Sequence, residues 1–230
     1  MGGLTRYEAT DNVATITMDD GKVNVLSVAM LGEINAALDR AEADKAAVVL
    51  AGREGRFSGG FDLGVFRSGN PADGVKMLRE GFSLAARLLA FPSPVVVACT
   101  GHAIAMGAFL LLSADYRIGA QGGFKIQANE TAIGMALPTA AYVITHERLT
   151  PNHAHRALAL SEVYPPDDTA IAAGWLDAVV PAGEVVASAQ AKAAELMALN
   201  MTAHVANKLK GRSETLASLR AAIDAEFPAG

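Results

Sequence analysis

The sequence predicts an α/β fold in which helices cover a mostly parallel sheet. Short runs of β-branched residues alternate with longer amphipathic segments, an order typical of parallel strands joined by right-handed crossovers. Residues 95–100 form an apolar run, as expected of a strand buried on both faces at the centre of such a sheet. With 230 residues, of which 51% are hydrophobic, the chain can bury a sizeable core.

The chain is predicted to open with a β-hairpin. Residues 6–10 and 13–18 alternate polar and apolar side chains on either side of Asp11 and Asn12, where a turn is expected. Ser27 is then placed to cap a helix, because the apolar residues that follow it recur on one helical face.

Strand, loop and helix signals follow in turn. Residues 47–51 predict a buried strand, and residues 53–63 predict a loop whose three glycines would let the backbone approach a ligand closely. Asn70 and Pro71 start a long amphipathic helix that is expected to run to Phe91, just before two prolines.

The central stretch, residues 94–119, is the segment around which the prediction is organised. Residues 95–114 alone have the length and apolarity of a membrane span, but polar residues and glycines interrupt them and no Lys/Arg cluster flanks them. A buried strand followed by a helix from near Ala105 to Asp115 is the better interpretation. The N-terminus of that helix would present free N–H groups, which favour anions and developing oxyanions.

The remaining elements are short and often begin at prolines. Further strands are expected at residues 116–119, 124–126 and 176–180, and further helices at 138–148, from 150 onward and between 165 and 174. Residues 185–227 predict two or more helices packed outside the sheet domain, with a break near Gly211. We therefore expect a core over residues 1–181 and a helical region over 182–230.

Charge and cysteine content restrict the class of protein. The formal net charge is -5, whereas nucleic-acid-binding proteins usually carry a basic face. The first ten residues lack the basic and apolar regions of a secretory signal, and the single cysteine, Cys99, cannot form an intrachain disulfide. We expect a cytoplasmic protein without nucleic-acid or membrane partners. His153 and His155 have too few partners to predict a metal site.

Two glycine-rich segments resemble the paired motifs of the crotonase, or enoyl-CoA hydratase/isomerase, superfamily. They are residues 57–63 (FSGGFDL) and 101–115 (GHAIAMGAFLLLSAD), and the resemblance extends from about Val13 to Val180. It implies a crotonase-like spiral of ββα units with a C-terminal helical trimerisation region. It also implies a homotrimer or dimer of trimers that acts on an acyl-CoA thioester without a cofactor.

In this family one backbone N–H of each motif points at the thioester oxygen. The resemblance assigns these donors to Phe61 and Met106, with Gly107 as the fallback because Met106 stands where relatives usually carry glycine. Deprotonation next to a thioester builds negative charge on that oxygen, and fixed amide donors stabilise the charge without reorganising.

The acid/base residues of the family suggest which reaction to expect. Hydratases use two glutamates, but this chain has Phe109 at the first of these positions. Residues 124–134 resemble the segment that supplies the second, which places it at Glu130, in an Asn-Glu-Thr context similar to that of mitochondrial-type Δ3,Δ2-enoyl-CoA isomerases. Hydration needs a water held between two carboxylates, whereas moving a double bond needs one base. An isomerase is therefore expected, with a hydratase and a non-catalytic acyl-CoA-binding protein as alternatives.

The resemblance also implies residues that bind the substrate. The set comprises Val25, Leu26, Ser58, Gly60, Asp62, Leu63 and Phe109, the last of which would also keep water out. Candidate contacts to the CoA phosphates are Lys22, Arg53 and Arg56, or Lys208 or Lys210 from a neighbouring subunit. Met77, Leu78 and Phe82 could line an acyl tunnel or merely pack the core.

Several of these residues have a simpler structural interpretation. Glu130 could be a solvated carboxylate near a turn, which Asn129 favours. Asp115 is expected to be a buried, hydrogen-bonded structural group, and His102 a structural residue near the second motif. Asp62 is expected to cap a short helix after the first motif.

Overall fold

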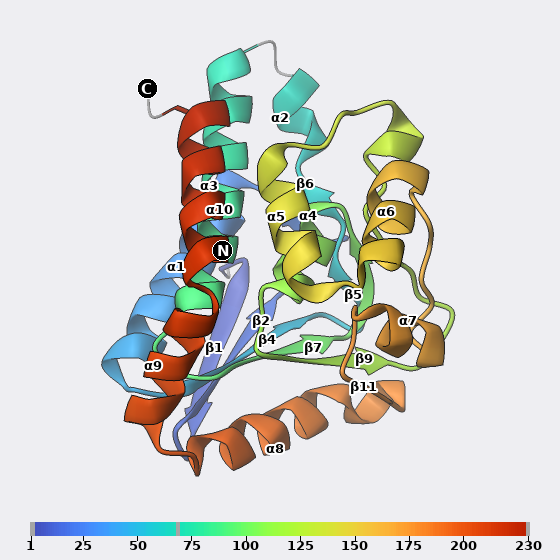
Figure 1. Cartoon of the computed structure of the whole chain (residues 1–230). Helices are drawn as coiled ribbons and strands as arrows, with labels where there is room; N and C mark the ends of the chain where they lie inside the picture. The colour runs from blue at the N-terminus through green and yellow to red at the C-terminus, as the bar shows by residue number, and fades with distance from the viewer. Residues whose placement is uncertain (1–2, 68–69, 229–230) are drawn as a thin grey trace.

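The computed structural model describes residues 3–67 and 70–228, and Figure 1 shows helices on both sides of a main sheet. The order of strands in this sheet is β1-β2-β4-β7-β9-β11. They are β1 (Thr5–Thr10), β2 (Val13–Met18), β4 (Ala47–Gly52), β7 (Val95–Cys99), β9 (Tyr116–Ala120) and β11 (Ala178–Val180). β1 pairs antiparallel with β2, and the other neighbours pair in parallel. The predicted hairpin and mostly parallel sheet are confirmed.

The central strands β4 and β7 are buried along their whole length. Val48 and Leu50 pair with Val95 and Val97, and their side chains belong to the core on the side of α1 and α3. The alternate residues of both strands pack on the opposite face, against α8. Burial on two faces explains why these strands are continuously apolar rather than alternating.

The helices follow the predicted order. They are α1 (Val28–Ala43), α2 (Leu63–Arg67), α3 (Pro71–Ala90), α4 (Met106–Leu112), α5 (Thr139–Arg148), α6 (Pro151–Leu160), α7 (Asp168–Ala173), α8 (Val185–Met197), α9 (Met201–Gly211) and α10 (Ser213–Glu226), with the 3-10 helices η1 (Thr131–Ile133) and η2 (Ala182–Glu184). Ser27 and Asn70 cap α1 and α3 as predicted, since their side chains accept the N–H groups of Met30 and Ala72. α4 ends at Leu112, three residues before the predicted end.

Two small sheets form where the sequence predicted a loop, a turn and, at residues 124–126, one short strand. One has the order β10-β8-β5, with β10 (Ile126–Gln127), β8 (Gly101–Ile104) and β5 (Gly55–Ser58), and the other pairs β3 (Val25–Leu26) with β6 (Gly60–Phe61). The prediction of a loop over residues 53–63 is therefore wrong in part. Strands of two to four residues are too short to show the alternation of apolar and polar side chains that marks a strand, and their partners lie far away in sequence.

The C-terminal helices pack directly on the rest of the chain. α8 lies along one face of the main sheet, at the bottom of Figure 1, whereas α10 lies beside α3 and α5. Leu216, Leu219 and Ile223 of α10 belong to the large core that also contains α1, α3 and α4. A division at residue 181 and a trimerising role for residues 182–230 stay predictions.

Asp115 ties the end of α9 to the central strand β7. Its carboxylate accepts the Val95 N–H at 2.8 Å and pairs with Lys208 Nζ at 2.7 Å and Arg212 Nη1 at 2.9 Å. The predicted structural role of Asp115 is confirmed. Because the Lys208 side chain is only 4% exposed and is paired here, the suggestion that it serves CoA phosphates is wrong.

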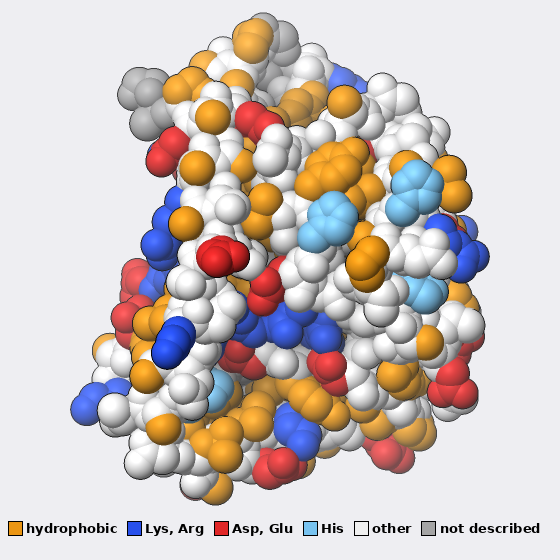
Figure 2. All heavy atoms as spheres, in the orientation of Figure 1, with side chains coloured by type: hydrophobic (Ala, Val, Ile, Leu, Met, Phe, Trp, Pro, Cys, Tyr) orange, Lys and Arg blue, Asp and Glu red, His pale blue; other side chains and the backbone are white. Residues whose placement is uncertain are grey.

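The apolar central stretch forms β7, β8 and α4 rather than one long helix. Within residues 3–67 and 70–228, no helix combines the length and apolarity needed to cross a membrane. On the face drawn in Figure 2, acidic and basic side chains are interspersed with apolar ones.

Candidate active site

An apolar cavity of about 380 Å³ lies where the two glycine-rich motifs meet the middle of α3, the segment before α5 and the end of α10. Its lining comprises Gly59, Phe61, Leu63, Phe66, Leu78, Phe82, Ala105, Asn129, Glu130, Ile133, Met135, Ala136, Leu137, Pro138, Glu226 and Phe227. The cavity therefore combines residues of the first motif, the second motif and the segment around Glu130. It has the character of a small-molecule site, since apolar walls surround a few polar groups.

The first motif reaches the cavity through Gly59, Phe61 and Leu63, and Gly60 lies just behind them. Gly60 has φ +88°, and a Cβ atom there would lie 2.8 Å from the Cβ of Ala105 and 2.9 Å from the carbonyl oxygen of Ile104. Only glycine combines this backbone conformation with so close an approach. The approach sets Phe61 directly beside the turn of the second motif.

The second motif begins α4 with an unusual backbone conformation. Ala105 has φ 51° and ψ −125°, and its carbonyl oxygen accepts the N–H groups of Ala108 at 2.8 Å and Phe109 at 3.2 Å. The N–H groups of Met106 and Gly107, at the first two helical positions, have no acceptor within the helix. Strained residues of this kind are often found at ligand sites.

Close packing holds the second motif against β5 and α3. A Cβ atom on Gly107 would lie 2.7 Å from the carbonyl oxygen of Ser58. The Met106 side chain is fully buried in the core, so it does not occupy the cavity beside the backbone. Gly81 of α3 leaves room for the Phe61 ring, since a Cβ atom there would lie 2.4 Å from Phe61 Cε1.

Glu130 has a carboxylate in an unusual, partly desolvated environment. Its Oε2 atom is buried and has no hydrogen-bond partner among the described residues. Burial disfavours the charged form and raises the pKa of Glu130 to about 7, although a backbone hydrogen bond opposes the shift. A carboxylate that lines a cavity in this way can accept and return a proton near neutral pH.

The backbone around Glu130 is held by the end of α6. The Thr131 hydroxyl donates to the carbonyl oxygen of Leu158 at 2.7 Å, and the Ala132 N–H donates to the Ser161 hydroxyl at 3.0 Å. The Met135 N–H donates to the Glu130 carbonyl oxygen at 2.9 Å. These bonds position the carboxylate without engaging it, which distinguishes Glu130 from a solvated surface residue.

The other predicted binding residues divide into two groups. Leu63 lines the cavity together with Phe61, whereas Leu26, Ser58, Gly60 and Phe109 are buried behind its wall. The Ser58 hydroxyl donates to the Asn24 carbonyl oxygen at 2.8 Å and accepts the Gly60 N–H at 3.2 Å. The Phe109 ring packs 6.2 Å from that of Phe82, which itself lines the cavity.

The remaining candidates lie nearer the surface. Val25 is half-buried on β3, and Asp62 caps α2 as predicted, since its side chain accepts the Gly64 N–H at 2.8 Å. Arg53 donates to the Lys22 carbonyl oxygen at 2.8 Å, and Arg56 donates to that of Gly55 at 2.8 Å. Contacts of these residues with CoA stay predictions.

His102 packs in a structural position. Its ring meets that of Phe124 edge-on at 5.5 Å, and its Nδ1 atom accepts the Lys125 N–H at 3.1 Å. Burial lowers the pKa of His102, helped by the nearby Arg56 and Lys125 charges. Among the described residues, no group of His, Cys, Asp or Glu could hold a metal ion.

Part of the cavity wall was missed by sequence reasoning. The residues concerned are Phe66, Ile133, Met135, Ala136, Leu137, Pro138, Glu226 and Phe227. Glu226 and Phe227 come from the far end of the chain and carry no local signal of a site. Gly81 did offer a signal, because a glycine inside a long amphipathic helix is unfavourable and needs a packing reason.

The whole chain can now be compared with known proteins. The enoyl-CoA hydratase/isomerase family matches residues 8–227. The chain belongs to this family. Its crotonase fold thus accounts for the junction of the two glycine-rich motifs and for the cavity that they share with Glu130.

Relatives with both activities in their names are similar to the chain. A probable enoyl-CoA hydratase of Rhodobacter capsulatus is 39% identical over 56% of the chain and 51% of that protein. The human mitochondrial enoyl-CoA delta isomerase 1 is 30% identical over 97% of the chain and 75% of that protein. The chain thus aligns with about half of the first protein and three quarters of the second.

Solved structures of the family are closely superimposable. An enoyl-CoA hydratase of Mycobacterium ulcerans has a TM-score of 0.94 and 48% identity, covering 98% of this chain and 100% of the other. A Mycobacterium tuberculosis protein carries both names: it is called an enoyl-CoA isomerase in one structure, with a TM-score of 0.93 and 46% identity over 97% of each chain, and a probable enoyl-CoA hydratase in another. The predicted superfamily and fold class are confirmed, and relatives named isomerase and relatives named hydratase are both similar to the chain.

Proposed function

We propose that the protein is a Δ3,Δ2-enoyl-CoA isomerase in which Glu130 is the single acid/base group. The observation that carries the proposal is the Glu130 carboxylate, whose Oε2 atom is buried without a hydrogen-bond partner among the described residues and whose pKa is raised by burial to about 7. The human relative named enoyl-CoA delta isomerase 1, 30% identical to this chain, supports the assignment.

The proposed reaction moves one proton and one double bond. Glu130 in its ionised form removes a proton from C2 of a 3-enoyl-CoA, and the C–H electron pair delocalises into the thioester oxygen. The N–H groups of Phe61 and Met106, or of Gly107 in place of Met106, stabilise this dienolate. Protonated Glu130 then returns the proton to C4, which leaves a conjugated 2-enoyl-CoA and regenerates the carboxylate.

Hydration would require a second group to hold and activate water. The other carboxylate on the cavity wall is Glu226, whose two oxygens each accept the Thr139 N–H at 3.0 Å and whose Oε1 atom also accepts the Thr139 hydroxyl. Glu226 is thus engaged in capping α5. Phe109 stands where the resemblance would put the first glutamate of a hydratase, and its ring is only 1% exposed.

A hydratase remains the second candidate because the Mycobacterium ulcerans relative, 48% identical, carries that name. The deciding experiment supplies 2-enoyl-CoA and 3-enoyl-CoA side by side and identifies the products. An isomerase forms the conjugated thioester from the 3-enoyl substrate. Formation of 3-hydroxyacyl-CoA under enzyme excess would instead establish the hydratase, and binding without either product would establish a non-catalytic protein.

The role of Glu130 is tested by Glu130→Gln, which keeps the shape of the side chain but removes its basicity. We expect turnover to fall at least about a hundredfold, because proton transfer by a positioned group contributes about two to four orders of magnitude. Glu184→Gln is the matched control, since Glu184 is exposed on η2. Normal turnover by the Glu130 variant would refute the assignment.

The pH dependence supplies a second readout of Glu130. Because the base must be ionised, kcat/KM should fall about tenfold per pH unit below an apparent pKa of about 7 in the free enzyme. An apparent pKa near the usual glutamate value would contradict the proposed environment.

We also propose that the protein is a cytoplasmic homotrimer or dimer of trimers that needs no cofactor. The family resemblance supports the assembly, and the proposed proton transfer involves no redox step. Sedimentation equilibrium of the full chain tests the assembly, and turnover after exhaustive dialysis against chelator tests the cofactor requirement. The human relative is named as mitochondrial, so localisation needs a direct measurement.

A further inference from the structure

The far wall of the cavity is built from a series of aromatic rings. The Phe61 ring meets the Phe82 ring edge-on, with centroids 6.1 Å apart, and Phe82 stacks on Phe227 with centroids 5.8 Å apart and planes 3° apart. Phe227 is only 6% exposed and lines the cavity. The series therefore leads from the proposed oxyanion residue to the C-terminal end of α10.

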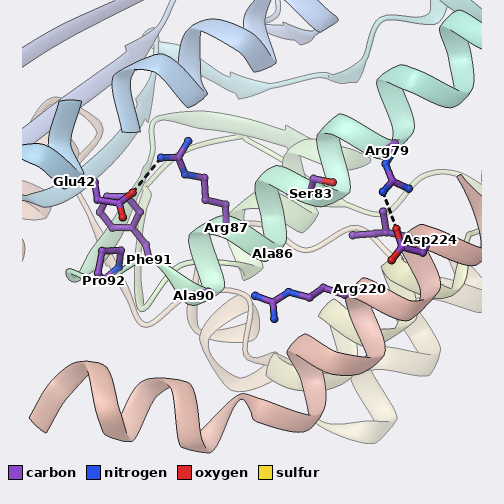
Figure 3. Close-up of a pocket in the computed structure, with 11 residues that line it drawn as sticks. Glu42, Arg79, Ser83, Ala86, Arg87, Ala90, Phe91, Pro92, Arg220 and Asp224 are labelled. Carbon is purple, nitrogen blue, oxygen red and sulfur yellow. Dashed lines mark hydrogen bonds and ion pairs between the residues drawn. The ribbon is translucent and has the colours of Figure 1, made fainter. Parts of the chain in front are cut away.

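Phe227 is held in place through its backbone and its neighbours. Arg79 of α3 donates from Nη1 to the Phe227 carbonyl oxygen at 2.6 Å and from Nη2 to Asp224 Oδ1 at 2.7 Å. Figure 3 shows this Arg79–Asp224 pair joining the two helices beside a hollow of about 460 Å³. Glu226 anchors the same turn to α5 through Thr139. The turn is thus tied on one side to α3, which lines the cavity, and on the other to the first residue of α5.

The chain leaves the cavity immediately after Phe227. Pro228 lines a different hollow on the outer side of α3, together with Lys76, Arg79 and Ser83, and none of these four residues lines the cavity of Glu130. The Phe227 ring thus stands between the cavity and the outer surface of α3. Removing the ring would extend the apolar space in the direction in which the rings run.

We propose that Phe227, backed by Phe82, ends the acyl site and sets the longest acyl chain that the protein accepts. The inference rests on the proposed function, because it requires the thioester oxygen at Phe61 and the acyl tail along Leu78 and Phe82. It assigns a specificity-determining role to a residue outside both glycine-rich motifs. Chains that end before Phe227 fit the existing cavity, whereas longer chains collide with its ring.

The test asks whether one variant lengthens, and another shortens, the acyl chain that the protein accepts. Saturated acyl-CoA thioesters of four to fourteen carbons are titrated by calorimetry, and kcat/KM is measured for 3-enoyl-CoA substrates of the same lengths. Two acyl chains are compared: the longest that the wild type accepts and the next longer one, which it rejects. Phe227→Ala should improve both the affinity and kcat/KM for the rejected chain, relative to the accepted one, by at least about tenfold. One methylene in an apolar pocket has an effect of this size. Phe227→Trp should shorten the accepted series.

Two further variants keep the test decisive. Leu219→Ala removes a fully buried side chain from the same helix at a position that does not line the cavity, and it should leave the chain-length profile unchanged. Phe227→Leu retains an apolar side chain if Phe227→Ala fails to fold, and it should shift the profile in the same direction by less. An equal shift in Leu219→Ala would overturn the proposal.

Binding separates this inference from the proposed function. A shifted binding profile without isomerase turnover supports the role of Phe227 while refuting the isomerase. Isomerase turnover with an unchanged profile in both Phe227→Ala and Phe227→Trp refutes the role of Phe227 alone. Wild-type protein that binds no acyl-CoA of any length overturns both.

Discussion

Asp115 and Glu130 are two largely buried carboxylates that follow the same helix, α4, and their surroundings differ completely. Asp115 accepts a backbone N–H from β7 and pairs with both Lys208 and Arg212. Glu130 has an Oε2 atom without a hydrogen-bond partner among the described residues and faces an apolar cavity. A carboxylate enclosed by cations holds a structure together, whereas one left without a partner keeps its acid/base capacity for a substrate.

The largest effect is expected from Asp115→Ala. The variant leaves the buried Lys208 without its carboxylate partner and leaves Arg212 with the longer, 3.9 Å pair to Glu147, so the free energy of unfolding should fall by about 3–5 kcal/mol. Burial already lowers the pKa of Lys208 even with Asp115 present. Denaturant unfolding measures the loss.

Glu8→Ala is the control for Asp115→Ala, since Glu8 pairs with Arg6 on the surface and both side chains are more than half exposed. It should change the free energy of unfolding by well under 1 kcal/mol. If Asp115→Ala lowers the free energy of unfolding by less than about 1 kcal/mol, the ion pairs of Asp115 contribute little to stability.

Glu130→Gln should raise the free energy of unfolding at neutral pH, whereas Asp115→Ala should lower it. The folded pKa of about 7 lies above the ordinary glutamate value of 4.5, so the folded state binds more protons between these pH values. Wild-type stability should therefore fall as pH rises from about 4.5 to about 7, by up to about 3 kcal/mol at 1.36 kcal/mol per pKa unit.

The matching measurement compares denaturant unfolding of wild type and Glu130→Gln at pH 5 and pH 8. The variant lacks the ionisation, so its advantage over wild type should grow between the two pH values. Glu184→Gln should show no such growth, because Glu184 is exposed. Parallel pH curves for wild type and Glu130→Gln would mean that Glu130 is not desolvated.

The contrast between the two carboxylates was only partly visible in the sequence. Asp115 follows a long apolar run, which made a buried structural role the natural prediction, but its partners lie about 90 residues further on. Glu130 was located by a family resemblance, whereas its raised pKa depends on burial in a cavity whose walls include α3, residues 133–138 and the end of α10. Burial of that kind arises from tertiary packing, which no local pattern encodes.

The difference between local patterns and tertiary packing also explains which helices and strands were predicted. α1 and α3 have clear caps and several helical turns, and the buried strands β4 and β7 have continuous apolar runs, so all four were found. β3, β6 and β8 are two to four residues long and exist because of their partners. The position of Phe227 is equally non-local, since the apolar pattern of α10 predicts a buried face but not the cavity at its end.

The close approach of the two glycine-rich motifs can be tested at Gly60. Gly60→Ala places a Cβ atom 2.8 Å from that of Ala105 at φ +88°, so the two motifs must separate. We expect kcat to fall by up to about a hundredfold, as on loss of one oxyanion donor. Gly21→Ala is the control, because Gly21 has φ +73° but nothing within 4 Å of the added Cβ. Equal kcat losses in both variants would mean that backbone strain, rather than the close approach, matters.

The smallest effect concerns how Glu130 is positioned. Ser161→Ala removes the hydroxyl that accepts the Ala132 N–H at 3.0 Å, beside a backbone that Gln127 also holds through the Ser161 carbonyl oxygen at 2.8 Å. Stability should fall by about 1 kcal/mol, the usual value of one hydrogen bond. Since the carboxylate itself is untouched, kcat should fall less than tenfold while the apparent pKa of the pH–rate profile stays near 7. A shift of that pKa toward 4.5 would show that Ser161 keeps water away from Glu130, and the desolvation of the carboxylate would then depend on this turn.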